Sequence, residues 1–452
     1  SVAIAYSGIP RATALGFVYA AFGVGAAASP VILTLRPVTI PSTDPAVPPG
    51  FTFDTTLAYA LAATASAVAL WAAYRFVPKI PGNLPASPKV VAGVTTWSLS
   101  ILAVVSGILG FIGPGDDRLP LILTVGGALG LLVMTLLLRR AGDALGPLLL
   151  DRKAVSAALA VGIAIGFAQA VPLMLLPVVF EFPLHYGMIF AILALIPFGL
   201  ALVLAGPISG ILLRRFGPRG IMSSGTLALG LANIAMALAL LYMTGSVRDF
   251  YAANPGESRV DLGVAHYLLF ILPLVLIGAG FVLATTVRTA IVFASTPRGL
   301  PATAAAVNEA SVGLGSRIGI VSATVAVVLA ATASARELVS HLPGPEADAL
   351  VDGFEEILYA LGTPLYKELY QAELRASEPV EAATYSVAYL DGVTVALVIA
   401  GVVAVIGAGL AWWLIGPRDP IQTVFDMQDE RQADEVLEPA GGPRRSSLPE
   451  SP

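Results

Sequence analysis

The chain has 452 residues, of which 56% are hydrophobic and 12% are charged, and its mean hydropathy is +0.83. A soluble protein carries about twice that charged fraction, so this chain cannot cover itself with polar surface and its solvent is lipid. The net charge of −5 and the lack of a basic stripe argue against nucleic acid as a partner. The absence of cysteine excludes disulfides, thiolate metal sites and thiol catalysis.

The apolar stretches predict an all-α membrane protein with about ten transmembrane helices. A spanning helix needs about 20 mostly apolar residues. The stretches that meet this length are 12–35, 54–77, 90–112, 119–139, 154–180, 184–213, 219–243, 265–288, 302–330 and 388–415.

Two further segments are not expected in the membrane. Residues 331–387 are rich in Asp and Glu, and their apolar residues recur at helical spacing from Leu350 to Leu361. This pattern favours a helical hairpin lying on the outer surface, with a solvated loop that contains a marginal helix as the alternative. Residues 417–452 are rich in Pro, Glu and Asp and have little to bury, which is typical of a disordered tail.

The distribution of Lys and Arg predicts the orientation. With the N-terminus inside, 18 of the 25 Lys and Arg residues lie on the inner side or in the inner half of a span, and 7 lie outside. Cytoplasmic loops carry such an excess, so we expect both termini in the cytoplasm. Trp412 and Trp413, just before Arg418, fit an aromatic anchor at the inner face.

Three sequence motifs resemble those of major facilitator transporters. Residues 205–221, AGPISGILLRRFGPRGI, are similar to the loop motif G-x-L-a-D-r-x-G-r-K through Gly210, Arg214, Arg215, Gly217 and Arg219. Arg214 stands at the position where the family has Asp.

The other two motifs narrow the resemblance to one branch of the family. Residues 16–34 resemble the antiporter motif G-x8-G-x3-G-P-x2-G-G through Gly16, Gly25 and Pro30. Residues 308–321, NEASVGLGSRIGIV, resemble the pattern N-[DE]-t-t-r-e-l-G-g-a-l-G-v-A through Asn308, Glu309, Gly315 and Gly319. Together they resemble the bacterial drug:proton antiporters with fourteen spans.

The resemblance implies a domain arrangement. Residues 1–80 would hold the last two helices of an N-terminal bundle, 81–150 two linking helices, 151–416 a complete six-helix second bundle with the outer hairpin at 331–387, and 417–452 a cytoplasmic tail. Four N-terminal helices of the family are then absent. Because such transporters rock two bundles around a shared site, we expect the intact protein to export and this chain alone not to.

The resemblance also implies a function. It indicates a proton-coupled secondary transporter of the bacterial cytoplasmic membrane that exports amphipathic or hydrophobic small molecules, with protons, membrane lipid and the missing helices as partners. Two alternatives stay open: a lipid or glycolipid exporter, and a non-transporting remnant or partner-dependent scaffold. No cofactor, metal site or enzyme activity is expected, because the three histidines lack metal-ligand spacing and no nucleophile–base pattern is evident.

Glu309 and Asp391 are the candidates for proton coupling. Glu309 lies about 10 Å along its predicted helix, and desolvation there would raise the pKa of a carboxyl group toward neutrality. The alternative is a helix-end carboxylate that is solvated or paired with Arg288 or Arg298. Asp391 is expected to open the last span at the outer surface, where it either contacts protons or substrate or interacts with the helix dipole.

Gln169, Asn308 and Arg317 are the candidates for the substrate cavity. A buried amide such as that of Gln169 needs a polar partner, either in a cavity or across helices. An arginine as deep as Arg317 rarely faces lipid, and it could bind an anionic group or neutralise a carboxylate on another span. This argues against a purely cationic substrate.

Overall fold

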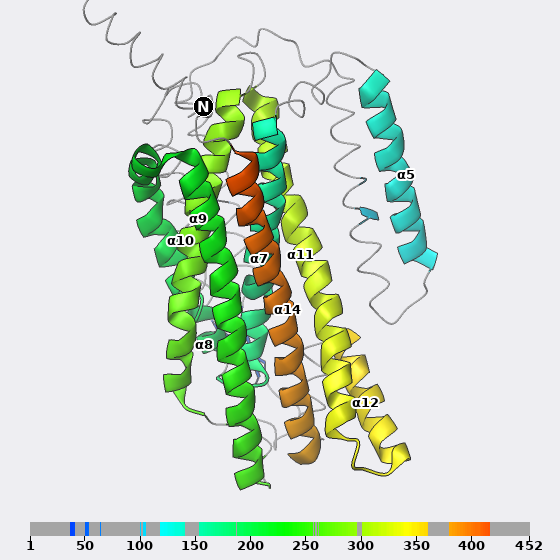
Figure 1. Ribbon diagram of the computed structural model, residues 1–452. Coiled ribbons are helices and arrows are strands. Elements are labelled where there is room, and N and C mark those ends of the chain that lie inside the picture. Colours follow the sequence, from blue (N-terminus) through cyan, green and yellow to red (C-terminus); the bar gives the residue numbers. More distant parts are fainter. Residues whose placement is uncertain are drawn as a thin grey trace, which may run out of the picture.

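Figure 1 shows the computed structural model of the chain. The structure describes residues 37–40, 50–53, 64, 100, 103–104, 118–140, 153–186, 188–255, 257, 260, 262–295, 301–359 and 379–415. Most of the predicted spans 12–35, 54–77 and 90–112 lies outside the described residues, as do Gly16, Gly25, Pro30 and the tail 417–452. The predictions made for those segments therefore stay predictions.

The described part of the N-terminal third contains one short strand pair and one helix. Strand β1 (Pro37–Ile40) pairs antiparallel with β2 (Gly50–Phe53). The all-α expectation did not include this pair, which forms where β-branched and aromatic residues, both favourable in strands, lie on either side of the Pro-rich sequence 41–49. Helix α5 (Arg118–Arg140) corresponds to the span expected at 119–139.

Among the described residues, six helical segments are long and apolar enough to cross a membrane, and they match the fifth to tenth predicted spans. The segments are Val155–Glu181, Ile196–Leu213, Arg215–Ala253, Ala265–Phe293, Val307–Leu338 and Glu381–Leu414. They belong to α7 (Lys153–Glu181), α9 (Ile196–Ala253), α10 (Leu268–Ser295), α11 (Pro301–Leu338) and α14 (Pro379–Leu414), with α9 holding two of them. These helices form the bundle in Figure 1.

The outward-facing side chains of the bundle mark the part that lies in lipid. On α14 every exposed large hydrophobic residue lies between Val395 and Leu414, a length of about 29 Å at 1.5 Å per residue. This matches the hydrocarbon thickness of a bilayer, about 30 Å. Exposed leucines and isoleucines such as Leu204, Leu231 and Leu329 continue the apolar belt around the other helices. The bundle is therefore that of a multi-pass membrane protein.

Several predicted boundaries are wrong at one end of the bundle. The span expected at 184–213 is interrupted, because α7 ends at Glu181, the short α8 covers Met188–Leu193, and α9 begins only at Ile196, next to Pro197. Proline is favourable in the first turn of a helix and unfavourable further inside, so Pro197 fixes this start. The last span begins at Pro379 rather than at 388.

Close glycine contacts hold α7 at the centre of the bundle. A side chain at Gly166 would collide with the backbone carbonyl of Val312, and one at Gly315 with that of Ile163. The α7–α11 seam formed by Gly162, Gly166, Gly315 and Gly319 therefore brings the two backbones together, as small residues do between membrane helices.

Similar contacts join the other helices in a regular pattern. Gly278 of α10 meets the first part of α9 at Phe198, and Gly225 of the second part meets α10 at Ala284. Gly407 of α14 meets α7 at Ala164, and Gly230 of α9 meets α14 at Gly401. Asn233, fully buried in α9, adds a hydrogen bond from Nδ2 to the Ala168 carbonyl of α7 (3.0 Å).

The corner between the two parts of α9 depends on Gly217. Its φ of 71° and ψ of 167° interrupt the helical conformation, and only glycine adopts such angles without strain. Pro218 follows and restarts the helix from a favourable first-turn position. Thus the loop motif at 210–219 forms a one-residue break rather than an extended loop.

The helices extend well beyond the apolar belt at the other end of the bundle. Helix α12 (Gly344–Tyr359) packs there against α11 and α14 (Figure 1). Phe354 stacks on Tyr385 with ring centroids 4.9 Å apart, and the Tyr385 hydroxyl donates to the Leu350 carbonyl (3.1 Å). The first helix of the expected hairpin is therefore present and docked, while its second half lies outside the described residues.

The glycine seam gives a stability prediction with a built-in control. Gly315→Ala should destabilise the bundle by about 1–3 kcal/mol, because the new methyl group overpacks the contact with the Ile163 carbonyl. Gly313→Ala on the same helix should be neutral or stabilising, since nothing lies within 4 Å of its added carbon atom. Thermal unfolding of both variants in one detergent measures the difference in stability. Equal unfolding midpoints would contradict the close contact between α7 and α11 at Gly315.

Candidate functional site

Arg288 is the largest fully buried side chain in the described residues, with an exposed fraction of 0%. It lies on α10, two turns before the helix ends at Ser295. The sequence interpretation ended this span at Arg288 and treated the residue as a possible partner of Glu309. In the structure the apolar helix continues past it to Phe293, so the arginine is inside the bundle.

The position of Arg288 depends on the glycine seam. The Arg288 Nη1 atom would lie only 2.5 Å from a side-chain carbon placed at Gly162. The missing side chain of Gly162 thus provides the space that the guanidinium occupies between α7, α10 and α11.

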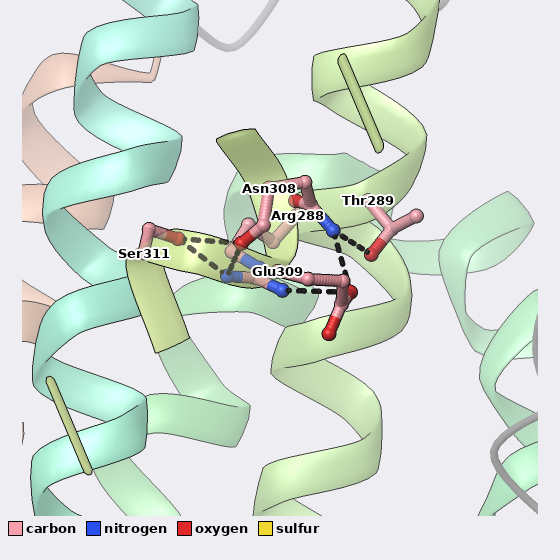
Figure 2. A network of polar contacts seen from close by, with 5 residues as sticks. All are labelled: Arg288, Thr289, Asn308, Glu309 and Ser311. Atoms are coloured by element: carbon pink, nitrogen blue, oxygen red, sulfur yellow. Dashed lines mark hydrogen bonds and ion pairs between the residues drawn. The ribbon is translucent and has the colours of Figure 1, made fainter. Parts of the chain in front are cut away.

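A network of polar groups from α10 and α11 surrounds the guanidinium (Figure 2). Its Nη1 atom donates to the Asn308 carbonyl (2.9 Å) and to Ser311 Oγ (2.8 Å), and Ser311 Oγ donates to the same carbonyl (2.7 Å). These acceptors are neutral. They satisfy the buried cation partly through hydrogen bonds that do not depend on a carboxylate.

Glu309 lies at the edge of the network. Its Oε1 atom is 3.7 Å from Arg288 Nη2, an ion-pair distance longer than a hydrogen bond, and it accepts a hydrogen bond from Asn308 Nδ2 (3.0 Å). The Arg288 side chain is fully buried, whereas the Glu309 side chain is 64% exposed. The pair therefore joins a cation held inside the bundle to a carboxylate that opens to the surroundings.

Asn308 connects the two charged residues to the rest of α10. It is 1% exposed, and its Nδ2 atom also donates to Thr289 Oγ1 (3.0 Å). Asn308 was expected in a substrate cavity; in the structure it is buried and its amide donates to the Glu309 carboxylate, and the cavity role stays a prediction. The desolvation expected of Glu309 is wrong, because its side chain is 64% exposed, and the alternative that it pairs with Arg288 is present.

Asp391 forms a second ionic contact at the opposite end of the bundle. Its Oδ2 atom accepts hydrogen bonds from Arg248 Nη2 on α9 (3.2 Å) and from Ser334 Oγ on α11 (2.7 Å). Asp391 lies twelve residues inside α14, so the alternative that it interacts with the dipole at the helix N-terminus is wrong. It ties three helices together near the edge of the apolar belt.

The two ionic contacts mark the two ends of the bundle. Glu309 and Ser334 are both on α11, 25 residues apart, which corresponds to about 38 Å along the helix. This slightly exceeds the hydrocarbon thickness. We refer below to the Arg288 end and the Asp391 end.

The remaining predicted residues lie apart from the network. Gln169 is half-buried on α7, and Arg317 is exposed on α11. At the Arg288 end, Arg215 is exposed, and the Arg219 guanidinium lies over the Trp412 ring at 4.0 Å from its centroid. The structure does not describe the side chain of Arg214.

Comparison with known proteins does not identify the chain. No protein-family model matches it, and no curated protein matches it significantly. Among the described residues, no group of three His, Cys, Asp or Glu side chains could hold a metal ion.

The network predicts that its members contribute unequally to stability. Ser311→Ala should cost about 1–3 kcal/mol, because the buried Arg288 guanidinium loses an acceptor. Glu309→Gln should change stability by less than about 1 kcal/mol, since this carboxylate is largely exposed and the neutral acceptors stay. Thermal unfolding would rank the variants; a larger loss in Glu309→Gln would show that the carboxylate is the main support of Arg288.

Proposed function

We propose that the protein is a proton-coupled secondary transporter of the major facilitator type that exports amphipathic or hydrophobic small molecules across a bacterial cytoplasmic membrane. The observation that carries the proposal is the Arg288–Glu309 pair, in which a buried cation meets an exposed carboxylate at one end of a membrane-spanning bundle.

The order of helix contacts supports this type of fold. If α7 and the two parts of α9 form one repeat, and α10, α11 and α14 form a second, a two-fold relation pairs equivalent contacts. The α7–α11 seam then corresponds to the contact of α10 with the first part of α9, and the α7–α14 contact to that of α10 with the second part. Nested repeats of three helices are typical of each half of a major facilitator transporter.

The chemistry of Glu309 suits proton exchange better than that of Asp391. Glu309 is exposed, and protonating it leaves Arg288 with its neutral acceptors, so both charge states of the carboxyl group are compatible with the folded bundle. Asp391 accepts hydrogen bonds from two helices and is 24% exposed. Protonating it would weaken a contact that holds three helices, so we assign Asp391 a structural role.

The loop motif and the cations near it support the orientation. Gly217 needs its positive φ, and Arg215 and Arg219 lie at the Arg288 end beside the exposed Trp412 and Trp413. Cations and tryptophans at the same end are typical of the cytoplasmic interface. We therefore place the Arg288 end in the cytoplasm and the Asp391 end outside.

The transport proposal predicts the effect of removing the exchangeable proton. Glu309→Gln should abolish substrate export driven by a pH gradient while leaving expression intact, because glutamine cannot bind and release a proton. The measurement is made in membrane vesicles from cells that express the whole gene, so that every helix encoded with this chain is present.

Two controls accompany this measurement. Glu355→Gln removes a carboxylate that pairs with Arg336 at the Asp391 end, and it should leave coupling unchanged. Undiminished pH-driven export by Glu309→Gln would end the assignment of Glu309, and no export by the unaltered protein would favour a non-transporting scaffold.

The absence of cysteine makes the orientation directly testable. A single cysteine replacing the exposed Glu257 at the Asp391 end should react with a membrane-impermeant maleimide on intact cells. A cysteine replacing Arg215 should react only after the membrane is opened. The reverse pattern of labelling would invert the orientation.

A further inference from the structure

Arg317 lies on the outer surface of α11, within the apolar belt. It follows Glu309 by eight residues, or about 12 Å of helix rise, and precedes the exposed Ile318. The Asp391 end begins near Ser334, about 25 Å further along the same helix. The guanidinium is thus attached well inside the layer defined by the two ionic contacts.

Within the described part of the structure, no carboxylate forms a salt bridge with Arg317, and Glu309 contacts Arg288 instead. The predicted spans 12–35, 54–77, 90–112 and 119–139 contain a single acidic residue, Asp54, at the outer end of the second.

An anionic group from outside the described residues would stabilise an arginine at this depth. A charge on a lipid-facing helix costs about 2.5–3.5 kcal/mol even by insertion measurements, and such residues normally face a pathway or a partner. Side chains on a helix lean toward its N-terminus, which for α11 is the Arg288 end. The guanidinium is therefore offered to a group that enters from that end.

The surface between the two charged residues is open. Glu309, Gly313 and Arg317 follow one another at intervals of four residues, and all three are exposed. Nothing lies within 4 Å of a carbon atom added at Gly313, so an apolar body can lie directly against the helix there. We refer to these three residues as the α11 strip.

We propose that the α11 strip binds an amphiphile with an anionic head group, a carboxylate, sulfate or phosphate on an apolar body, and that Arg317 determines this specificity by pairing with the head group. The inference rests on the proposed transport function and adds its substrate class. The planar guanidinium donates two parallel hydrogen bonds to such oxyanions.

A binding measurement tests this without any pH gradient. The full chain is placed in nanodiscs of phosphatidylcholine and titrated with the fluorescent fatty acid 11-(dansylamino)undecanoate. Arg317→Gln should weaken binding by about tenfold or more, whereas Arg317→Lys should keep part of the affinity. Arg336→Gln, which removes an exposed arginine of the same helix outside the belt, should bind as the unaltered protein does.

Competition identifies the head group. Decanoate should displace the probe and decyltrimethylammonium should not. Equal affinity of Arg317→Gln and the unaltered protein, or equal displacement by the cationic competitor, would overturn the proposal. If adding phosphatidylglycerol to the nanodiscs abolishes probe binding only when Arg317 is present, the strip holds a lipid head group, and the substrate assignment is wrong.

The outcome can be separated from that of the transport assay. Glu309→Gln should bind the anionic probe at least as tightly as the unaltered protein, because it removes a negative charge from the α11 strip, while losing pH-driven export. Probe binding that depends on Arg317, in a protein that shows no export, would remove the proposed function and leave the anion site. Export that is unaffected by Arg317→Gln would remove the substrate class alone.

Discussion

The high cost of placing an ionised side chain in hydrocarbon explains why the ion pairs of this bundle lie at its two ends. Between its two ends, the helices contain long apolar stretches whose leucines and isoleucines face outward. The ionic contacts gather at the ends, with Arg288 and Glu309 at one and Asp391, Arg248 and Ser334 at the other. Each contact also joins different helices, so the requirement to pair charges fixes helix positions as well.

Close helix packing makes the buried arginine possible. Glycines on α7 and α11 let the two backbones approach, and the space left by Gly162 is filled by the Arg288 guanidinium. The same approach brings the Asn308 carbonyl and Ser311 Oγ within hydrogen-bond distance. The site is therefore a product of the seam: a larger residue at Gly162 would both separate the helices and displace the cation.

The amount of structure that the sequence predicts follows from the physics of each feature. Apolar runs of about 20 residues are sufficient to locate the six described spans, because the bilayer imposes that length. Apolar runs do not show where a helix continues into water. This is why the start of α14 was predicted nine residues too late; its additional turns are covered by α12. The sequence did not predict the burial of Arg288, because its partners lie about twenty residues away on another helix. Only the uninterrupted apolar sequence after Arg288 indicated its depth in the bundle. Glu309 was recognisable as an isolated carboxylate near the start of an apolar span.

In the proposed transporter, the unequal burial of Arg288 and Glu309 would let one pair combine structure with proton exchange. A salt bridge with both partners buried is costly to break, because each loss leaves an uncompensated charge. Here the Arg288 Nη1 atom has two neutral acceptors that do not depend on the charge of Glu309, and the carboxylate reaches the surroundings. Neutralising Glu309 does, however, change the electric field along α11, where Arg317 is the next charge, about 12 Å away. A proton bound at Glu309 increases the net positive charge of the α11 strip and strengthens its attraction for an anion, whereas proton release weakens it. In an antiporter, binding of the proton and binding of the substrate ordinarily oppose each other. Coupling through the α11 strip therefore requires that Glu309 binds its proton when the strip faces one side of the membrane and that Arg317 binds the substrate when the strip faces the other.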